Sequence, residues 1–210
     1  TSIEEWKDRL ATIFYSYMQA NPNVRQIRYI GVKDNGKELV RVERQHGDIT
    51  TTDELSLQEK GDTDYYKEAI HLTPGSVLIS EIELNKEYGK IDFPEWPTYR
   101  VAIGTYNQNM TLFGFIIINI DATEFLSQFL SDSDVSQTYL MNSDLKFILH
   151  PNSHLNFAFE HSTNQPDSWG NYFKTPFPEI PYTVQTIKDP YEKEMVNQAT
   201  SIKYNRKGKV

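Results

Sequence analysis

The chain has 210 residues, enough for one large domain or two small ones, and its net charge of -8 gives a pI near 5.1. Because no basic stripe is present to neutralise phosphates, we expect no nucleic-acid partner. The absence of cysteine excludes a thiol nucleophile, a cysteine zinc site and a disulfide scaffold. No apolar run reaches 18 residues, and we interpret the chain as a soluble piece of a longer protein.

The first 50 residues predict a helix followed by a β-hairpin. Ser2 and Glu5 have capping-box spacing, and apolar residues then recur at helical spacing, which predicts an amphipathic helix over residues 3–19. Two β-rich runs, residues 26–32 and 38–43, flank Asn35-Gly36. This dipeptide is typical of a type I′ turn, because both of its positions need a positive φ.

Residues 57–120 predict a short helix and three strands. Tyr66 and Ile70 lie one turn apart on the helix, and strands are expected over residues 76–84, 98–106 and 111–120. A long loop with two prolines separates the first two of these strands. We expect the N-terminal helix to cover one face of the sheet, and residues 57–70 together with this loop to cover the other. Alternating helices and adjacent antiparallel strands favour an α+β fold over a doubly wound sheet.

The chain also contains an internal repeat. A second capping-box-like start opens a helix over residues 121–130, and a second hairpin is expected over residues 139–150. Residues 139–151 align with residues 30–42 at an offset of 109. Each copy then has a helix and a hairpin of its own. We therefore predict two modules, residues 1–125 and 126–210, the second being the shorter.

Three histidines raise the question of a metal site. His150, His154 and His161 lie close in sequence, but Pro151 biases His150 away from helical geometry and no HExxH pattern is present. A hydrolase elbow of the GxSxG type is absent as well. We predict no metal, no cofactor and no catalytic residue in this chain.

A second set of residues suggests ligand binding. An arginine fork together with tyrosine hydroxyls suits a small carboxylate. Each arginine taken alone could instead be an ordinary surface or sheet-face residue. Two adjacent tyrosines cannot both face the core of one short helix, so one of them is expected in a cleft. The candidate ligand-binding residues are Arg41, Lys60, Asp62, Tyr65, Tyr66 and Arg100.

Five segments together resemble a known family. In chain order they are YIGVKDNGKELVRVER, LQEKGDTDYYKEAIHL, GSVLISEIELNKEYGKI, YRVAIG and GFIIINID. Their order and spacing are similar to those of the double Cache (tandem PAS-like) sensor domains of bacterial histidine kinases, diguanylate cyclases and chemoreceptors. LNKEYGKI is similar to the kinase branch in particular. HPN and NFAFE are similar to the membrane-proximal module.

The resemblance implies a fold and a function. It implies a long N-terminal helix and two PAS-like modules, each a mainly antiparallel sheet with flanking helices, with the ligand in the distal module and His150 a structural residue at a strand end. The domain would face the periplasm or cell exterior, and the full-length protein would be a dimer in the bacterial inner membrane. Any kinase or cyclase activity would belong to a cytoplasmic domain outside this chain.

One position departs from the family pattern. Members that bind amino acids often have Arg before the Tyr or Trp of the short helix, where Thr63 stands here. The ligand class therefore stays open, with a small carboxylate as one candidate. Two alternatives also remain, namely sensing through a periplasmic partner protein with an empty pocket, and a periplasmic enzyme domain.

Overall fold

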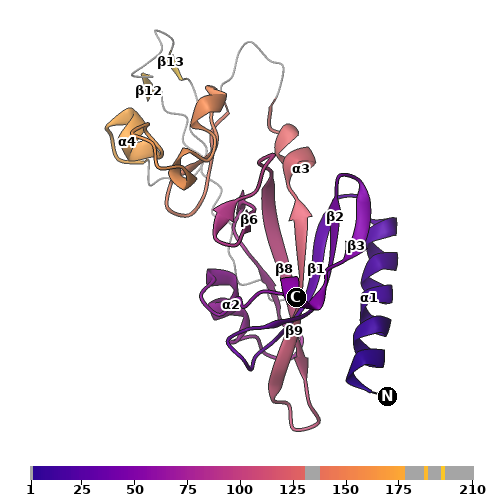
Figure 1. Ribbon diagram of the computed structural model, residues 1–210. Helices are drawn as coiled ribbons and strands as arrows, with labels where there is room; N and C mark the ends of the chain where they lie inside the picture. The colour runs from indigo at the N-terminus through magenta and orange to yellow at the C-terminus, as the bar shows by residue number, and fades with distance from the viewer. Residues whose placement is uncertain (1, 131–137, 178–186, 189–194, 197–210) are drawn as a thin grey trace. The chain divides into compact units, whose positions relative to one another are not determined.

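The computed structural model describes residues 2–130, 138–177, 187–188 and 195–196 (Figure 1). The chain separates into two compact units. The first unit contains residues 2–81 and 85–122, and the second contains residues 82–84 and the described chain from residue 123 onward. The assignment of two PAS-like modules to residues 1–125 and 126–210 stays a prediction.

The first unit is built from two α-helices and a large antiparallel sheet. Six strands follow the order β3-β2-β1-β9-β8-β4, and every neighbouring pair is antiparallel. The predicted α+β fold with a mainly antiparallel sheet is therefore confirmed. The elements are α1 Ile3–Ala20, β1 Val24–Gly31, β2 Glu38–Gln45, β3 Asp48–Thr51, a 3₁₀ turn Glu54–Ser56, α2 Asp64–Ala69, β4 Val77–Ile79, β6 Lys86–Glu87, β7 Lys90–Ile91, β8 Pro97–Tyr106 and β9 Leu112–Asp121.

Helix α1 begins and ends where the sequence predicts. The Ser2 hydroxyl accepts a hydrogen bond from the Glu5 backbone N–H, and the Glu5 carboxylate accepts one from the Ser2 backbone N–H. Such a capping box satisfies two of the free donors at a helix start. The helix stops at Asn21, immediately before Pro22.

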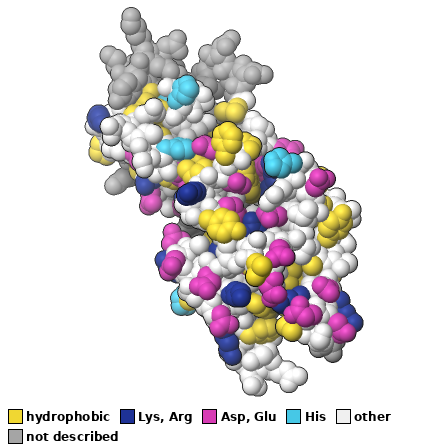
Figure 2. Space-filling model, viewed as in Figure 1, with side chains coloured by type: hydrophobic (Ala, Val, Ile, Leu, Met, Phe, Trp, Pro, Cys, Tyr) yellow, Lys and Arg dark blue, Asp and Glu magenta, His cyan; other side chains and the backbone are white. Residues whose placement is uncertain are grey.

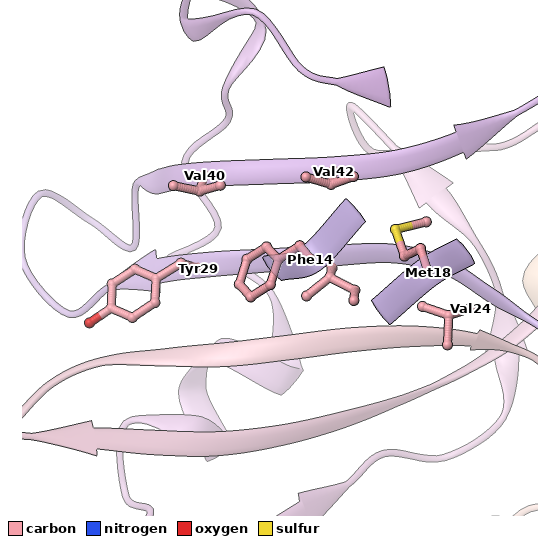
Figure 3. Close-up of a cluster of buried hydrophobic side chains, with 7 residues drawn as sticks. Phe14, Met18, Val24, Tyr29, Val40 and Val42 are labelled. Carbon is pink, nitrogen blue, oxygen red and sulfur yellow. The ribbon is translucent and has the colours of Figure 1, made fainter. Parts of the chain in front are cut away.

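The two faces of the sheet are covered by different elements. Helix α1 packs on one face, where its Phe14 and Met18 join valines and Tyr29 from β1 and β2 in one buried cluster (Figure 3). Helix α2 covers the opposite face, and Figure 1 shows the two helices on opposite sides of the sheet. The sequence predicted this arrangement for the N-terminal helix and for residues 57–70.

The first hairpin has a longer turn than a two-residue type I′ turn. Asp34, Asn35 and Gly36 all have positive φ, between 53° and 70°. The carbonyl oxygens of Asn35 and Gly36 accept hydrogen bonds from the backbone N–H groups of Gly61 and Lys60, at 2.9 and 3.0 Å. The tip of the hairpin is therefore shaped by the segment that precedes α2, which local sequence does not reveal.

Two other predictions in this unit are only partly right. The strand expected over residues 76–84 is interrupted after β4, and its end forms the short strand β5 Glu83–Leu84 in the second unit. The proline-rich loop that follows contains a small hairpin, β6–β7, which pairs Glu87 with Lys90. This hairpin forms a separate two-stranded sheet.

The second unit has a small aromatic core. Phe147, Trp169, Tyr172 and Phe173 are buried together. The predicted second hairpin is present as β10 and β11, and the helix predicted over residues 121–130 is shorter in the structure. The described elements are α3 Thr123–Ser127, β10 Leu140–Met141, β11 Phe147–Leu149, two 3₁₀ turns Ser153–Leu155 and Ala158–Glu160, α4 Trp169–Phe173, β12 Ile187–Lys188 and β13 Met195–Val196.

The surface of the molecule is mixed in charge. Figure 2 shows acidic side chains spread over the visible face with lysine and arginine side chains between them. Among the helices that the structure describes, none combines the length and the apolar character that a membrane span requires.

Candidate functional site

Buried polar side chains gather on the sheet face opposite α1, and we call seven of them the polar face. The alternation of strand residues places them there, with one exception. Glu38 has the same parity as Val40, which faces α1, but a β-bulge opposite Tyr29 and Ile30 turns Glu38 to the other face. The polar face consists of Gln26, Arg28, Glu38, Arg41, Glu43, Arg100 and Asn119.

Two segments cover the polar face. The segment before and within α2 contributes Gln58, Lys60 and Tyr65. The other segment, at and just before β6, contributes Asn85 and Glu87. Long loops and short elements therefore hold the groups that oppose the sheet.

Arg28 is at the centre of the polar face and is 2% exposed. Its guanidinium donates to Asn119 Oδ1 at 2.6 Å, to the Tyr65 hydroxyl at 3.2 Å and to Glu38 Oε1 at 3.4 Å. Burial acts to lower the pKa of Arg28, but Tyr65 and Glu38 outweigh burial and raise the pKa above its ordinary value. Arg28 therefore carries a fixed positive charge.

Arg41 connects three carboxylates. Its guanidinium lies 2.6 Å from Glu43 Oε2, 3.1 Å from Glu87 Oε2 and 3.8 Å from Glu38 Oε2. Burial again opposes the charge, yet Glu87, Glu38 and Glu43 together raise the pKa of Arg41. In the reverse direction, burial would raise the pKa of Glu87, but Arg41 and hydrogen bonds from Gln26 and Gln58 lower it to about 2.

Tyr65 lies between two arginines. The guanidinium carbon of Arg100 is 4.8 Å from the centre of the Tyr65 ring, and that of Arg28 is 5.4 Å away. These are cation–π distances. Nearby, Lys60 donates to Gln58 Oε1 at 2.8 Å, and burial followed by the charge of Arg28 lowers the pKa of Lys60.

The structure brings four of the six predicted ligand-binding residues together. Arg41, Lys60, Tyr65 and Arg100 are all buried at the polar face. Arg41 lies in the middle of β2. The role of these residues in binding stays a prediction.

The other two predicted residues lie elsewhere. Asp62 is exposed. Tyr66 packs against Phe115, and its hydroxyl donates to the Val32 carbonyl oxygen at 2.9 Å. The premise that two adjacent tyrosines cannot both face the core is wrong, because both are buried, at 9% and 8% exposure. They can share the core because the polar face gives Tyr65 buried partners of its own. The prediction that one of them faces a ligand cleft stays a prediction.

Sequence reasoning missed several charged residues of the site. Arg28 stands between Ile27 and Tyr29 in a β-rich run, and this interruption of an apolar strand was a usable signal. Glu38 was concealed by the bulge. Glu87 lies in a segment that the sequence predicts to be a loop, and nothing local indicates that its side chain contacts the polar face.

The surroundings of His150 are those of a packed residue in an aromatic core. His150 directly follows β11 and is buried against the rings of Phe147 and Tyr172, with centroid distances of 4.8 and 4.5 Å. Its Nδ1 accepts a hydrogen bond from the Asn152 backbone N–H at 2.9 Å. Within the described residues, no group of three or more His, Asp or Glu side chains is arranged to hold a metal ion.

The chemistry of the polar face is that of charge recognition. It combines four cationic side chains with three carboxylates, counting Lys60 and Glu87 from the covering segments. Buried charges are costly unless they are paired, and here each of Arg28 and Arg41 has a carboxylate within 3.4 Å. Guanidinium and hydrogen-bonding groups of these kinds are the ones that proteins use to recognise small charged molecules.

Solved structures with the same fold include domains of sensory proteins, histidine kinases and chemoreceptors. A domain of a sensory box/GGDEF family protein from Vibrio parahaemolyticus is 21% identical, with a TM-score of 0.64, covering 78% of this chain and 61% of that one. The extracellular domain of the histidine kinase designated vpHK1S-Z8 is also 21% identical, with a TM-score of 0.62 and coverages of 78% and 58%. The ligand-binding domain of the Campylobacter jejuni chemoreceptor Tlp3, solved with L-valine, is 15% identical, with a TM-score of 0.57 and coverages of 92% and 68%.

The family is shown by a sequence model rather than by these distant structures. The chain spans about three fifths of the length of the first two solved structures, at 61% and 58%. No curated protein matches the chain. The model of the bacterial histidine kinase sensor domain matches residues 1–176. The chain therefore belongs to the family of bacterial histidine kinase sensor domains, as the order of its segments predicted.

Proposed function

We propose that this sensor domain binds a small polar molecule at the polar face of its first unit and passes a conformational bias across the bacterial inner membrane. The domain would lie in the periplasm or outside the cell. The full-length protein would be dimeric, and its kinase or cyclase activity would belong to a cytoplasmic domain.

The observation that carries this proposal is the concentration of buried charge on one side of a sheet. Three arginines and a lysine are buried there at 2% to 6% exposure. Replacing buried ion pairs with apolar side chains is often neutral or stabilising, so stability alone does not favour such a cluster. Recognition of a charged ligand does favour it, because charge-assisted hydrogen bonds in a buried site are strong and directional.

The positions of these side chains suggest which part of the site each would supply to a bound ligand. Arg28, Arg41 and Arg100 would hold a ligand from the floor of the sheet, and Lys60 and Tyr65 would contact it from the covering segment. Asp62 and Tyr66 stay as untested predictions from the sequence.

A distant relative supports a small organic ligand. The Tlp3 domain was solved with L-valine. Thr63 in this chain stands where amino-acid-binding members of the family often have Arg, so we favour a small carboxylate over an amino acid as the ligand.

The proposal is tested by a thermal-shift screen of small carboxylates, amines and sugars. We expect a carboxylate to stabilise the wild type, and Arg100→Ala to abolish that shift while the protein stays folded. Arg9→Ala is the matched control, because Arg9 is an exposed arginine of α1. A ligand that binds Arg100→Ala with unchanged affinity would remove this residue from the site.

A second candidate function rests on a specific observation. The charges of the polar face already contact one another, at 2.6 Å between Arg41 and Glu43 for example. If these charges are fully paired without a ligand, the domain would instead sense through a periplasmic partner protein. If no compound shifts the wild type and signalling in cells requires a second periplasmic protein, this alternative would be favoured.

A further inference from the structure

The carboxylate of Glu87 is held in the way that a bound carboxylate ligand would be held. Its Oε1 accepts from Gln26 Nε2 at 2.7 Å, and its Oε2 accepts from Gln58 Nε2 at 2.8 Å and from Arg41 Nη1 at 3.1 Å. Both oxygens therefore have a short hydrogen bond, and one of them also has a cationic donor. This is the donor set that a binding site presents to a free carboxylate.

The donors are fixed while the carboxylate is on a separate element. Gln26 and Arg41 are in β1 and β2, two paired strands of the large sheet, and both are 4% exposed. Glu87 is in β6, which pairs with β7 and forms its own two-stranded sheet. At the tip of this hairpin, Tyr88 is 70% exposed.

Few of the contacts described for the hairpin tie its tip to the large sheet. Besides Glu87, the Tyr88 hydroxyl donates to the Ser56 carbonyl oxygen at 3.3 Å, near the limit of a hydrogen bond. The base is held by backbone bonds of Asn85 with Trp96 and Asp92. The Glu87 carboxylate, with hydrogen bonds to Gln26, Gln58 and Arg41, therefore provides the shortest described contacts between the tip and the polar face.

We infer that Arg41, Gln26 and Gln58 form a carboxylate-binding subsite, and that Glu87 is its internal occupant, which the carboxylate of a ligand replaces. This inference rests on the proposed function and names the ligand class. Exchange of one carboxylate for another leaves the buried charge unchanged, so no cation of the polar face is left unpaired. Exchange also releases the β6–β7 hairpin from the sheet, which gives the two states that a sensor needs.

The subsite can be tested with acetate before any natural ligand is known. Glu87→Ala removes the internal carboxylate and leaves its three donors. We expect acetate to raise the melting temperature of Glu87→Ala saturably, with an apparent Kd about tenfold or more below that of the wild type, because the competitor is gone. Chloride at equal ionic strength should have no such effect.

Two controls make the result specific. Glu68→Ala removes an exposed glutamate of α2 in the same unit and should respond to acetate as the wild type does. Glu87→Ala combined with Arg41→Ala should lose the acetate effect. Equal responses of Glu87→Ala, Glu68→Ala and the wild type would overturn the inference.

A second measurement covers the case in which Glu87→Ala does not fold. Glu87→Gln keeps the shape of the side chain and removes its charge, so acetate should also bind it more tightly than the wild type. Because the chain has no cysteine, a dye can be attached at Lys90→Cys in the hairpin or at Asn109→Cys in the β8–β9 turn. In the Glu87→Gln background, acetate should change the signal of the first label and not that of the second. Identical responses of the two labels would contradict release of the hairpin.

These outcomes are separable from failure of the proposed function. A screening hit that needs Arg100 but binds the wild type and Glu87→Gln equally would overturn the internal occupant and leave the polar face as the ligand site. Conversely, a saturable acetate site in Glu87→Ala without any screening hit for the wild type would support the subsite and count against sensing of the compounds screened.

Discussion

The contribution of Glu87 to stability should depend on pH in a defined direction. Its pKa falls from 4.5 to about 2 on folding, mainly because the charge of Arg41 and the hydrogen bond from Gln26 outweigh the effect of burial. A carboxyl whose pKa is depressed in the folded state adds stability above its unfolded pKa and loses it as pH falls toward the folded pKa. The Glu87 contribution is therefore complete above about pH 5 and disappears between about pH 5 and 2.

The magnitude follows from the same two values. The difference between 4.5 and about 2, at about 1.4 kcal/mol per pH unit, gives about 3 kcal/mol at neutral pH. By pH 3 about half of this should remain. The Glu87 side chain is 17% exposed, so solvent screening reduces the figure only modestly.

The assay is urea unfolding of the wild type and Glu87→Gln at pH 7, 5, 4 and 3. A Trp169→Phe background leaves Trp6 and Trp96, both in the first unit, as the fluorescent reporters. We expect the difference in unfolding free energy between the two proteins to shrink steadily below pH 5. Glu68→Gln, at an exposed site, should show a difference near zero throughout. If the difference in unfolding free energy between the wild type and Glu87→Gln stays constant from pH 7 to pH 3, the assigned role of Arg41 in holding Glu87 ionised is refuted.

Three further predictions concern stability. Ser2→Ala should cost about 1 kcal/mol of unfolding free energy, because it removes the capping box of α1, and chemical denaturation would measure this. Gly36→Ala should lower the unfolding free energy more than Gly47→Ala does. Both positions have a positive φ, but only at Gly36 would a Cβ meet the Tyr66 ring, 2.5 Å from Cε2. Equal losses of unfolding free energy would argue against this packing. Arg28→Met should destabilise the protein by about 3 to 5 kcal/mol, because it removes a buried ion-pair partner of Glu38. Lys67→Met removes an exposed ion pair with Asp64 and should change stability by less than about 1 kcal/mol. Similar losses for the two variants in calorimetry would contradict the buried pairing.

The parts of the fold that depend on local pattern were predictable from the sequence. The capping box at Ser2, the strands on either side of Asn35-Gly36 and the covering role of residues 57–70 are all present in the structure. The site was predictable only in part, because Arg41, Lys60, Tyr65 and Arg100 signal binding by residue type alone. To place Glu38 in the polar face, one must know of the β-bulge, which depends on pairing between strands. To place Glu87 in the site, one must know of its tertiary contact with Arg41, which lies 46 residues away in the sequence.

The strands β1 and β2 serve both sides of the first unit at once. Val40 and Val42 hold α1 on one side, while Arg41 and Glu43, their immediate neighbours in the chain, belong to the polar face on the other. A single layer of backbone thus separates the helix from the charged groups. A change in the local twist of these strands would turn adjacent side chains together, so we expect the position of α1 and the geometry around Arg41 to change together. Hydrogen exchange of the α1 amides would report the state of the opposite face directly.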